Sequence, residues 1–337
     1  KPSKGDDMNT QTNYLGLELN SPLVVAASPL SKSIDNIKKM EEKGAGAVVL
    51  NSLFEEQIRQ ESMELEFGTS RGMESSPEAS SYFPDISSFD IGPQEYLDHI
   101  RKAKEAVDIP IIASLNGTSL GGWTDYAKKI EDAGADALEL NIYSIPTDKT
   151  QTASDFEDNV LQIVRSVRKT VNIPLAVKLS PFFSNLSNFV SRLKEEGADG
   201  VVLFNRFYQP DIDIEKLGVE SNLQLSSQVE SRMPLRWVAI LSADSKIDFA
   251  GNSGIHQADD VIKMLLVGAN VTQLCSSLLQ NGIEHLETIN NDLRSWMEKN
   301  DYQSVQQLQG SMNQKHVDDP SAYERAQYMN TIRSYDL

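Results

Sequence analysis

The sequence predicts an α/β protein folded as a (β/α)8 TIM barrel with long loops after strands 2 and 6, and three observations support this. The first is an internal repeat: residues 107–115 (Val-Asp-Ile-Pro-Ile-Ile-Ala-Ser-Leu) return about 64 positions later at 171–179 as Val-Asn-Ile-Pro-Leu-Ala-Val-Lys-Leu. A second pair, 131–141 and 195–205, has the same offset, which corresponds to two strand–helix units. The other two observations are an alternation of apolar runs with amphipathic stretches, and a helix ending that recurs.

Eight short apolar runs are predicted to be the strands, because parallel strands buried on both faces have nearly continuous apolar sequences. In chain order they are Pro22–Ser28, Ala47–Asn51, Ile109–Leu115, Ala137–Asn141, Pro174–Leu179, Gly200–Asn205, Ile247–Gly251 and Val271–Cys275. In the stretches between them, apolar residues recur every three or four positions, as one buried helix face requires. The predicted helices are Ser33–Lys43, Glu95–Val107, Trp123–Ala133, Phe156–Val171, Leu186–Glu196 and Ala258–Val267.

Four of these helices end in nearly the same sequence. The endings are Lys43-Gly-Ala-Gly, Ala133-Gly-Ala-Asp, Glu196-Gly-Ala-Asp and Val267-Gly-Ala-Asn. Glycine supplies the left-handed position that closes a helix before the next strand. Eight strands punctuated in this way predict a closed barrel, whose chemistry is expected at the carboxyl ends of the strands.

The predicted barrel spans residues 12–310. Residues 1–11 are interpreted as a leader or a cloning remnant, and residues 311–337 as a tail that packs on the barrel or at an oligomer contact. Residues 54–92 and 208–233 are long and polar, and loops of this length in a compact domain are usually functional lids or disordered.

The composition excludes several classes of function. A net charge of −18, from 49 acidic and 31 basic residues, argues against nucleic acid and anionic membranes as partners. No apolar run approaches the roughly 20 residues of a membrane span, and the start has no secretory signal, so a cytoplasmic location is expected. The single cysteine, Cys275, rules out an internal disulfide or a cysteine-ligated iron–sulfur cluster within the chain. The four histidines have no metal-ligand spacing, so no metal site is predicted.

Small and polar residues gather at the predicted carboxyl ends of the strands. These candidate site residues are Ala27, Ser28, Asn51, Ser114, Asn116, Asn141, Lys178, Asn205, Gly251, Ser253, Gly254, Cys275 and Ser276. The turns after strands 7 and 8 are where many barrels bind a phosphate through backbone N–H groups. The amides and the lysine suit a planar heterocycle rich in carbonyls and ring nitrogens.

Lys178 is the strongest single signal, because it interrupts an otherwise apolar strand and a buried ammonium must be paired. Beside a flavin, its charge would stabilise the anionic reduced ring. The alternatives are a structural lysine bound to a neighbouring carboxylate such as Glu139, or a Schiff-base lysine in an aldolase-type barrel. Cys275 falls at the phosphate turn and is interpreted as a packing residue there rather than as a nucleophile.

Five motifs together resemble the dihydroorotate dehydrogenase family of FMN barrels and, similarly, the pyrimidine-reducing domain of dihydropyrimidine dehydrogenase. The motifs are Glu139-Leu-Asn-Ile-Tyr-Ser144, Val177-Lys-Leu-Ser-Pro181, Val202-Leu-Phe-Asn205, Ala250–Ile255 and Gln273–Leu278. The likeness runs from about Thr12 to Gly310 in order and spacing.

The resemblance implies a role for each matching position. Lys178 would lie near the flavin pyrimidine ring, and Asn141 and Asn205 would contact both flavin and substrate. Ala27 and Ser28 would contact the flavin from strand 1. The turns Ser253-Gly254 and Cys275-Ser276 would hold the FMN phosphate. Ser144, three residues after Asn141, matches the active-site base.

Two substrate contacts of the family are changed. The final asparagine of its strand-4 motif is replaced by Pro146, and its strand-2 lysine aligns with Leu50. The asparagine-rich segment after strand 2 is unrecognisable in 73–91, where Asp90 is the nearest polar candidate. The residues implied for FMN are therefore kept, and those implied for orotate are largely changed.

The leading hypothesis is an FMN-dependent dehydrogenase acting on the CH–CH bond of a dihydropyrimidine-like substrate, with hydride transfer to flavin N5. The sequence has no Gly-x-Gly-x-x-Gly fingerprint, so electrons are expected to pass to a soluble or protein acceptor. The resemblance also implies a homodimer. Three alternatives remain: a flavin barrel with a non-pyrimidine substrate, a non-catalytic FMN-binding subunit, and the Schiff-base barrel.

Overall fold

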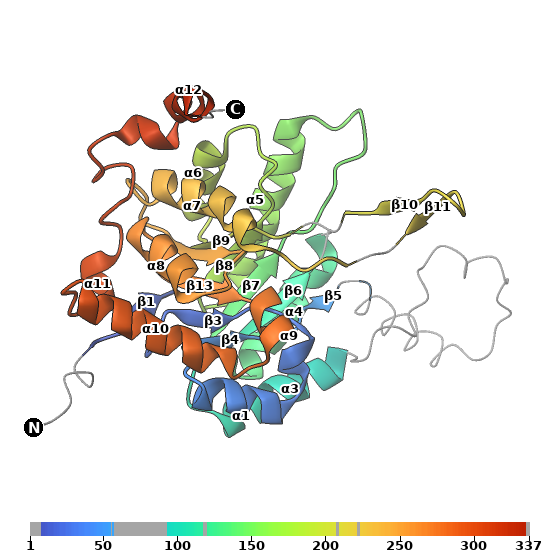
Figure 1. Ribbon diagram of the computed structural model, residues 1–337. Helices are drawn as coiled ribbons and strands as arrows, with labels where there is room; N and C mark the ends of the chain where they lie inside the picture. Colours follow the sequence, from blue (N-terminus) through green and yellow to red (C-terminus); the bar gives the residue numbers. More distant parts are fainter. Residues whose placement is uncertain are drawn as a thin grey trace, which may run out of the picture.

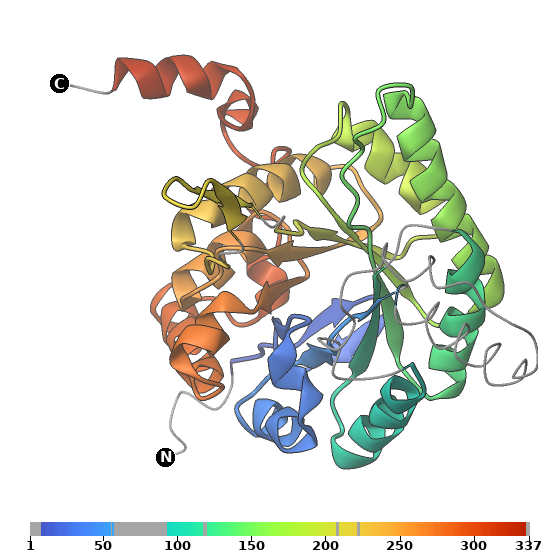
Figure 2. The ribbon, with the colours of Figure 1, turned by 90° about the vertical axis from the view of Figure 1, so that its right-hand side faces the viewer.

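Eight parallel strands close into a barrel in the computed structural model, which describes residues 8–54, 56, 93–116, 120–206, 209–220 and 223–334. Neighbouring strands follow the order β4-β3-β13-β12-β9-β8-β7-β6, and the pairing of β4 with β6 closes the ring. The barrel strands are β3 (Leu23–Val25), β4 (Ala47–Val49), β6 (Ile111–Asn116), β7 (Ala137–Asn141), β8 (Leu175–Leu179), β9 (Gly200–Leu203), β12 (Asp248–Asn252) and β13 (Val271–Leu274). The predicted (β/α)8 barrel is confirmed (Figures 1 and 2). Of the predicted strands, β7 is found with the predicted bounds, β12 is shifted by one residue at the same length, and the others are shorter than predicted.

Helices surround the strands (Figure 2). The six predicted helices are found as α1 (Ile34–Glu42), α3 (Pro93–Ala106), α4 (Leu120–Asp132), α5 (Ala153–Thr170), α6 (Leu186–Glu195) and α8 (Ala258–Leu266). Those not predicted are α7 (Arg232–Leu241), α9 (Ser276–Asn281), α10 (His285–Lys299), α11 (Val305–Leu308) and α12 (Ala326–Arg333), with short 3-10 turns at Pro29–Lys32, Gln228–Ser231 and Pro320–Tyr323. None of the helices in the described ranges combines the length and the apolarity that crossing a bilayer requires.

The two predicted loops have different outcomes. Residues 57–92, most of the loop predicted after strand 2, lie outside the described residues; before them β5 (Leu53–Phe54) pairs with the end of β6. The loop predicted after strand 6 contains structure of its own: the antiparallel hairpin of β10 (Asp211–Asp213) and β11 (Gly218–Glu220), followed by the turn Gln228–Ser231. Figure 1 shows this hairpin projecting from the barrel.

The recurring helix endings have a structural purpose beyond closing the helix. The last residue of three of them accepts a hydrogen bond from the backbone N–H of a strand residue beside it. Asp136 accepts from Ile111 at 2.7 Å, Asp199 from Leu175 at 3.0 Å and Asn270 from Phe249 at 2.9 Å. Each side chain therefore satisfies a donor where a strand enters the barrel.

The end of the barrel at which its strands begin is closed by apolar side chains. Tyr14, Leu15 and Leu19, on or beside the hairpin of β1 (Thr12–Tyr14) and β2 (Leu17–Leu19), are buried against the apolar residues of the barrel interior. The carboxylate of Asp248 accepts a hydrogen bond from the N–H of Leu15 at 2.6 Å and so fixes the hairpin beneath the strands. Access to the barrel is therefore confined to the carboxyl ends of its strands.

The tail after residue 310 packs against the barrel in part. The N–H of Gln314 donates to the carbonyl of Ala239 on α7 at 2.9 Å, and the N–H of Met312 donates to the carbonyl of Leu266 on α8 at 2.8 Å. Within the tail, the hydroxyl of Tyr323 donates to the carbonyl of Met312 at 2.6 Å. Helix α12 then extends from the body of the molecule (Figure 2). The predicted division into leader, barrel and tail stays a prediction, and residues 1–7 lie outside the described residues.

Candidate active site

A cavity of about 800 Å³ opens at the carboxyl ends of the strands. Nine of the predicted site residues line it: Ala27, Ser28, Asn116, Lys178, Asn205, Ser253, Gly254, Cys275 and Ser276. Asn116 and Lys178 lie on β6 and β8, and the others lie just after β3, β9, β12 or β13. Its size is in the range of cavities that bind cofactors and other small molecules.

Lys178 lies at the base of the cavity in a buried polar network. Its ammonium is 3.5 Å from Oε1 of Glu139 and 3.4 Å from Oε1 of Gln273, whose amide donates to Oε2 of Glu139 at 2.6 Å. Lys178 is 6% exposed, and the two partners are each 1% exposed. The lysine therefore has the carboxylate partner expected of a structural role, and it also faces the cavity, so the two interpretations are compatible.

Two asparagines meet at the mouth. The amide of Asn205 donates to Oδ1 of Asn141 at 2.6 Å. Asn141 ends β7, and the backbone N–H of Asn205 donates to the carbonyl of Leu179 on β8 at 2.7 Å. The pair places amide donors and acceptors side by side, and Asn141 is the register partner of Lys178 on the neighbouring strand.

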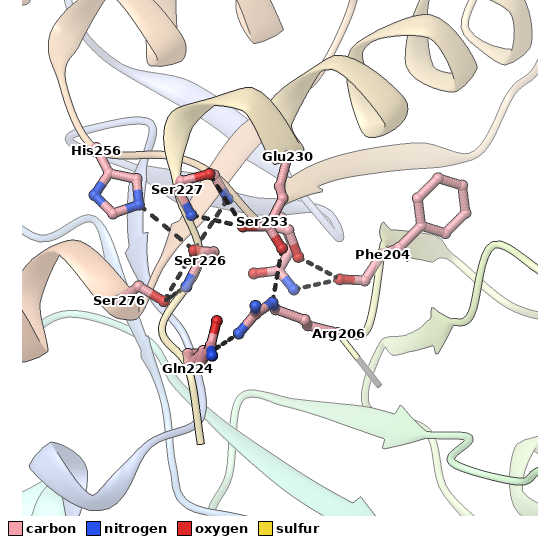
Figure 3. Close-up of polar contacts among 11 residues, drawn as sticks. Phe204, Arg206, Gln224, Ser226, Ser227, Glu230, Ser253, His256 and Ser276 are labelled. Atoms are coloured by element: carbon pink, nitrogen blue, oxygen red, sulfur yellow. Dashed lines mark hydrogen bonds and ion pairs between the residues drawn. The ribbon is translucent and has the colours of Figure 1, made fainter. Parts of the chain in front are cut away.

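The turns after β12 and β13 converge on one serine hydroxyl (Figure 3). The N–H of Gly254 donates to Oγ of Ser226 at 3.4 Å, and the same Oγ is 2.9 Å from Oγ of Ser276. The N–H of Ser226 also donates to Ser276 Oγ, at 3.1 Å. We call Ser226, Gly254 and Ser276 the serine–glycine cradle.

Glycine is required at position 254. Its φ is +74°, and a Cβ there would lie 2.3 Å from the backbone nitrogen of Ser231. A side chain at this position would therefore push the segment that carries Ser226 away from the cradle. Ser226 was missed by the sequence analysis, and its one signal was a pair of consecutive serines before a helix, within the long polar loop.

One buried polar atom of the cavity lining, Oγ of Ser28, lacks a hydrogen-bond partner among the described residues. Oδ1 of Asn51 lacks one as well, although Asn51 does not line the cavity; its backbone N–H donates to Ser31 Oγ at 2.8 Å. Because buried polar groups are nearly always paired, the hydroxyl of Ser28 is suited to bind a polar ligand. This observation fits a polar cofactor in the cavity.

Five predicted site residues do not line the cavity. Asn141 reaches it through Asn205, and Asn51 has the unpaired oxygen described above. Ser114 is buried, with Oγ 2.8 Å from Oγ of Ser52. Gly251 faces Met264 of α8, since a Cβ there would lie 2.9 Å from its sulfur, and it is the following residue, Asn252, that lines the cavity.

The fifth is Ser144, which is half-buried just beyond β7. Tyr143, the residue before it, does line the cavity. The structure thus places Ser144 beside the mouth rather than on its wall.

Cys275 lines the cavity above the end of β13. Burial raises the pKa of its thiol, and the nearby charge of Lys178 only partly opposes this shift. The thiol therefore stays protonated near neutral pH, which makes it a poor nucleophile, and its packing role stays a prediction.

Arg206 is a second residue that the sequence analysis missed. It follows Asn205 and lines the cavity. Its Nε donates to Oε1 of Glu230 at 2.8 Å, and Nη1 donates to the carbonyl of Gln224 (Figure 3). Leu50, by contrast, is fully buried and brings no charge to the mouth.

The fold and site define a (β/α)8 barrel enzyme with a polar cavity, a buried lysine at its base and a serine–glycine cradle on one wall. The chain belongs to the dihydroorotate dehydrogenase family, whose model, described as dihydroorotate dehydrogenase, matches residues 89–297. The resemblance given by the five motifs is thus confirmed, and the chain is a dihydroorotate dehydrogenase-like oxidoreductase.

Three similar proteins are each named catalytic subunit of dihydroorotate dehydrogenase B (NAD(+)). The protein of Thermoplasma volcanium is 29% identical over 89% of this chain and 97% of its own length. That of Thermoplasma acidophilum is 26% identical over the same shares. That of Pyrococcus abyssi is also 26% identical, over 89% of this chain and 98% of its own length.

Proposed function

We propose that the protein is an FMN-dependent dehydrogenase that acts on a CH–CH bond of a dihydropyrimidine-like substrate. The observation that carries this proposal is the placement of Lys178 at the base of a cavity whose wall holds the serine–glycine cradle. A ligand with a phosphate and a carbonyl-rich ring matches this arrangement, because the cradle suits the phosphate and Lys178 suits the ring carbonyls.

The residues present fit FMN. Gly254 offers a backbone N–H and Ser226 and Ser276 offer hydroxyls to a phosphate, while Ser28 offers an unpaired hydroxyl to a polar group of the ligand. When bound, FMN supplies the hydride acceptor of the reaction. Lys178 would offer its positive charge to a cofactor bound in the cavity, and its burial would strengthen this effect because the local dielectric is low.

Asn141 and Asn205 position the substrate. Their paired amides present both donors and acceptors, which suits the alternating carbonyl and N–H groups of a dihydropyrimidine. Ser144 accepts the C5 proton in this proposal. A serine is a weak base at its ordinary pKa, so it would pass the proton through a hydroxyl or water relay, and Tyr143, the preceding residue on the cavity wall, is a candidate for that relay.

The electrons leave to a separate protein or to a small-molecule acceptor. The chain has one cysteine and no Gly-x-Gly-x-x-Gly segment, so it supplies neither a cysteine-ligated cluster nor a dinucleotide site of that kind. The relatives are named catalytic subunits of an NAD(+)-linked enzyme, which supports a partner subunit as the acceptor. The homodimer and the cytoplasmic location stay predictions.

The test is an anaerobic titration of the purified yellow protein with dihydroorotate, followed by flavin absorbance. Bleaching would support the proposal for this substrate. A yellow protein that does not bleach would instead support the second candidate below, and a protein that neither contains nor binds FMN would overturn the proposal.

Ser144→Ala tests the base. The variant should bind FMN as the wild type does, while flavin reduction slows by about 10²- to 10⁴-fold. Ser295→Ala, which removes an exposed hydroxyl on α10, is the matched control. An unchanged reduction rate in Ser144→Ala would exclude Ser144 from proton transfer.

A second candidate is a flavin-dependent barrel that oxidises a substrate other than a pyrimidine. The fully buried Leu50 and the exposed Pro146 favour it, because they stand where the resemblance implies a lysine and an asparagine. Flavin reduction by another cyclic substrate but not by dihydroorotate would select this candidate.

A further inference from the structure

We infer that Arg206 binds an anionic group of the substrate, with Glu230 as the counter-ion that holds the guanidinium at the cavity mouth in the absence of substrate. This inference rests on the proposed function in one respect, that the cavity is the substrate site. It assigns to the substrate a carboxylate or a similar anion.

The first step is the distribution of charge in the cavity. Among the described residues that line it, the cations are Lys178 and Arg206. Lys178 is buried against the carboxylate of Glu139, so its charge is already compensated at the base. Arg206 is therefore the cation that can meet an anion entering from solvent.

The second step is position. Arg206 directly follows Asn205, whose amide contacts Asn141, and Arg206 and Asn205 line the same cavity. The cavity therefore offers its occupant both an amide pair and a guanidinium. Two carboxylates also line it, Glu56 after β5 and Asp211 on β10, but among the described residues the carboxylate paired with the guanidinium is Glu230.

The third step is how the guanidinium is held. Both of its contacts come from the segment before α7: Glu230 binds Nε and the carbonyl of Gln224 binds Nη1 (Figure 3). A guanidinium has five N–H donors in a planar fork, and no contact of Nη2 is seen within the described part of the chain. The fork is thus fixed in orientation while retaining donors for a carboxylate, which Arg binds in a bidentate manner.

The fourth step is the weakness of the Arg206–Glu230 pair. The side chains are 36% and 38% exposed, and ion pairs this open to solvent contribute little to stability. An incoming anion can therefore compete with Glu230 for the guanidinium. Glu230 also accepts from the N–H of Ser227 at 2.6 Å, so it remains anchored when Arg206 turns to a ligand.

The experiment compares two probes by isothermal titration calorimetry on the flavin-loaded protein. Orotate is a planar pyrimidine with a carboxylate, and uracil is the same ring without it. We expect the wild type to bind orotate more tightly than uracil. Arg206→Gln should weaken the binding of orotate by about 10- to 100-fold and leave the affinity for uracil unchanged. Arg206→Lys should restore part of the lost orotate affinity.

Glu230→Gln provides the opposite test. It removes the competing charge but keeps an oxygen for Ser227, so orotate affinity should rise. Arg165→Gln is the matched control, because Arg165 also pairs with a glutamate, Glu196, but on the outer helices. It lowers the net charge by the same amount as Arg206→Gln and should leave both affinities as they are.

Retention of the full preference for orotate over uracil in Arg206→Gln would overturn the inference. The Arg206–Glu230 pair would then only stabilise the loop after β9. The absence of a preference for orotate in both the wild type and Glu230→Gln would also overturn it. Failure of the proposed function is distinct: FMN would be absent, or no substrate would bleach it. Because heats of binding do not require turnover, charge-dependent binding at Arg206 can hold even when flavin reduction fails.

Discussion

Asn205 donates a hydrogen bond to Oδ1 of Asn141 at 2.6 Å, and the two residues are 64 positions apart, the offset of the internal repeat. They occupy equivalent places in the two repeat copies, at or just beyond the ends of β7 and β9, with β8 between these strands. The repeat therefore does more than duplicate strands and helices, since it brings the two terminal amides together next to β8, on which Lys178 is the register partner of Asn141.

Asn205→Ala should weaken the binding of a pyrimidine ring. The substitution removes the donor to Asn141 and one side of the amide pair, so orotate affinity should fall by about tenfold. Difference absorbance of the bound flavin during orotate titration measures this. Asn300→Ala, at the exposed end of α10, should have no effect, and an equal loss in that control would show a general rather than a local defect.

Ser226→Ala should weaken FMN binding. The hydroxyl of Ser226 is the point where the turns after β12 and β13 meet, so its loss removes one group of the cradle. We expect the dissociation constant of FMN to rise by about tenfold, measured by reconstitution of the apoprotein with fluorescence detection.

Gly254→Ala should have the larger effect on the same measurement. Its Cβ would lie 2.3 Å from the nitrogen of Ser231 and displace the segment that carries Ser226. Equal FMN affinity in Gly254→Ala and the wild type would exclude the cradle as the phosphate site.

The sequence was sufficient to predict the barrel because its signals are local. Apolar runs, helix periodicity and the repeated Gly-Ala endings each lie within one strand–helix unit, and β3, β8 and β13 form as predicted. Helix α7 was not predicted, because proline is typical of loops and Pro234 lies near its start. In the structure Pro234 is in the first turn of the helix, where a residue needs no backbone N–H donor.

Residues of the site that depend on contacts between distant segments could not be predicted from the sequence. Ser226 acts through Ser276, 50 positions away, and Arg206 through Glu230, 24 positions away. Neither contact can be recognised from sequence periodicity, because both form only when the loop after β9 folds back on the barrel. Gly251 shows the complementary difficulty, because strand alternation turns it toward Met264 and leaves Asn252 to line the cavity.

Lys178→Met should destabilise the protein strongly. It leaves the carboxylate of Glu139 buried without a counter-ion, and breaking such a pair costs about 3 to 5 kcal/mol. Urea denaturation of the wild type and variant measures this cost.

The double variant Lys178→Met/Glu139→Gln separates stability from function. It has no unpaired buried charge, so most of the lost stability should return, while flavin reduction should remain slow because no ammonium faces the ring. Rapid reduction in a stable double variant would assign Lys178 a structural role only.

Glu131 should make stability depend on pH. Its carboxylate, at the end of α4, accepts from the N–H groups of Asn172 and Ile173 at 2.7 and 3.2 Å and pairs with Lys128. Burial alone would raise the pKa of this carboxyl, but the hydrogen bonds to Lys128 and to the two N–H groups outweigh it, so its pKa lies below the ordinary 4.5. A lowered folded-state pKa stabilises the folded protein when the group is ionised.

The sign of the effect follows from that shift. The contribution of Glu131 is complete above pH 4.5 and is lost as the pH falls from there through the lower folded-state pKa. Glu131→Gln should therefore lower the free energy of unfolding by about 1 kcal/mol at pH 7, with the difference from wild type shrinking in acid. Urea denaturation at a series of pH values tests this, with Glu298→Gln on α10 as the control. A difference that stays constant from pH 7 to pH 3 would mean that packing of the side chain, and not its charge, joins α4 to the entrance of β8.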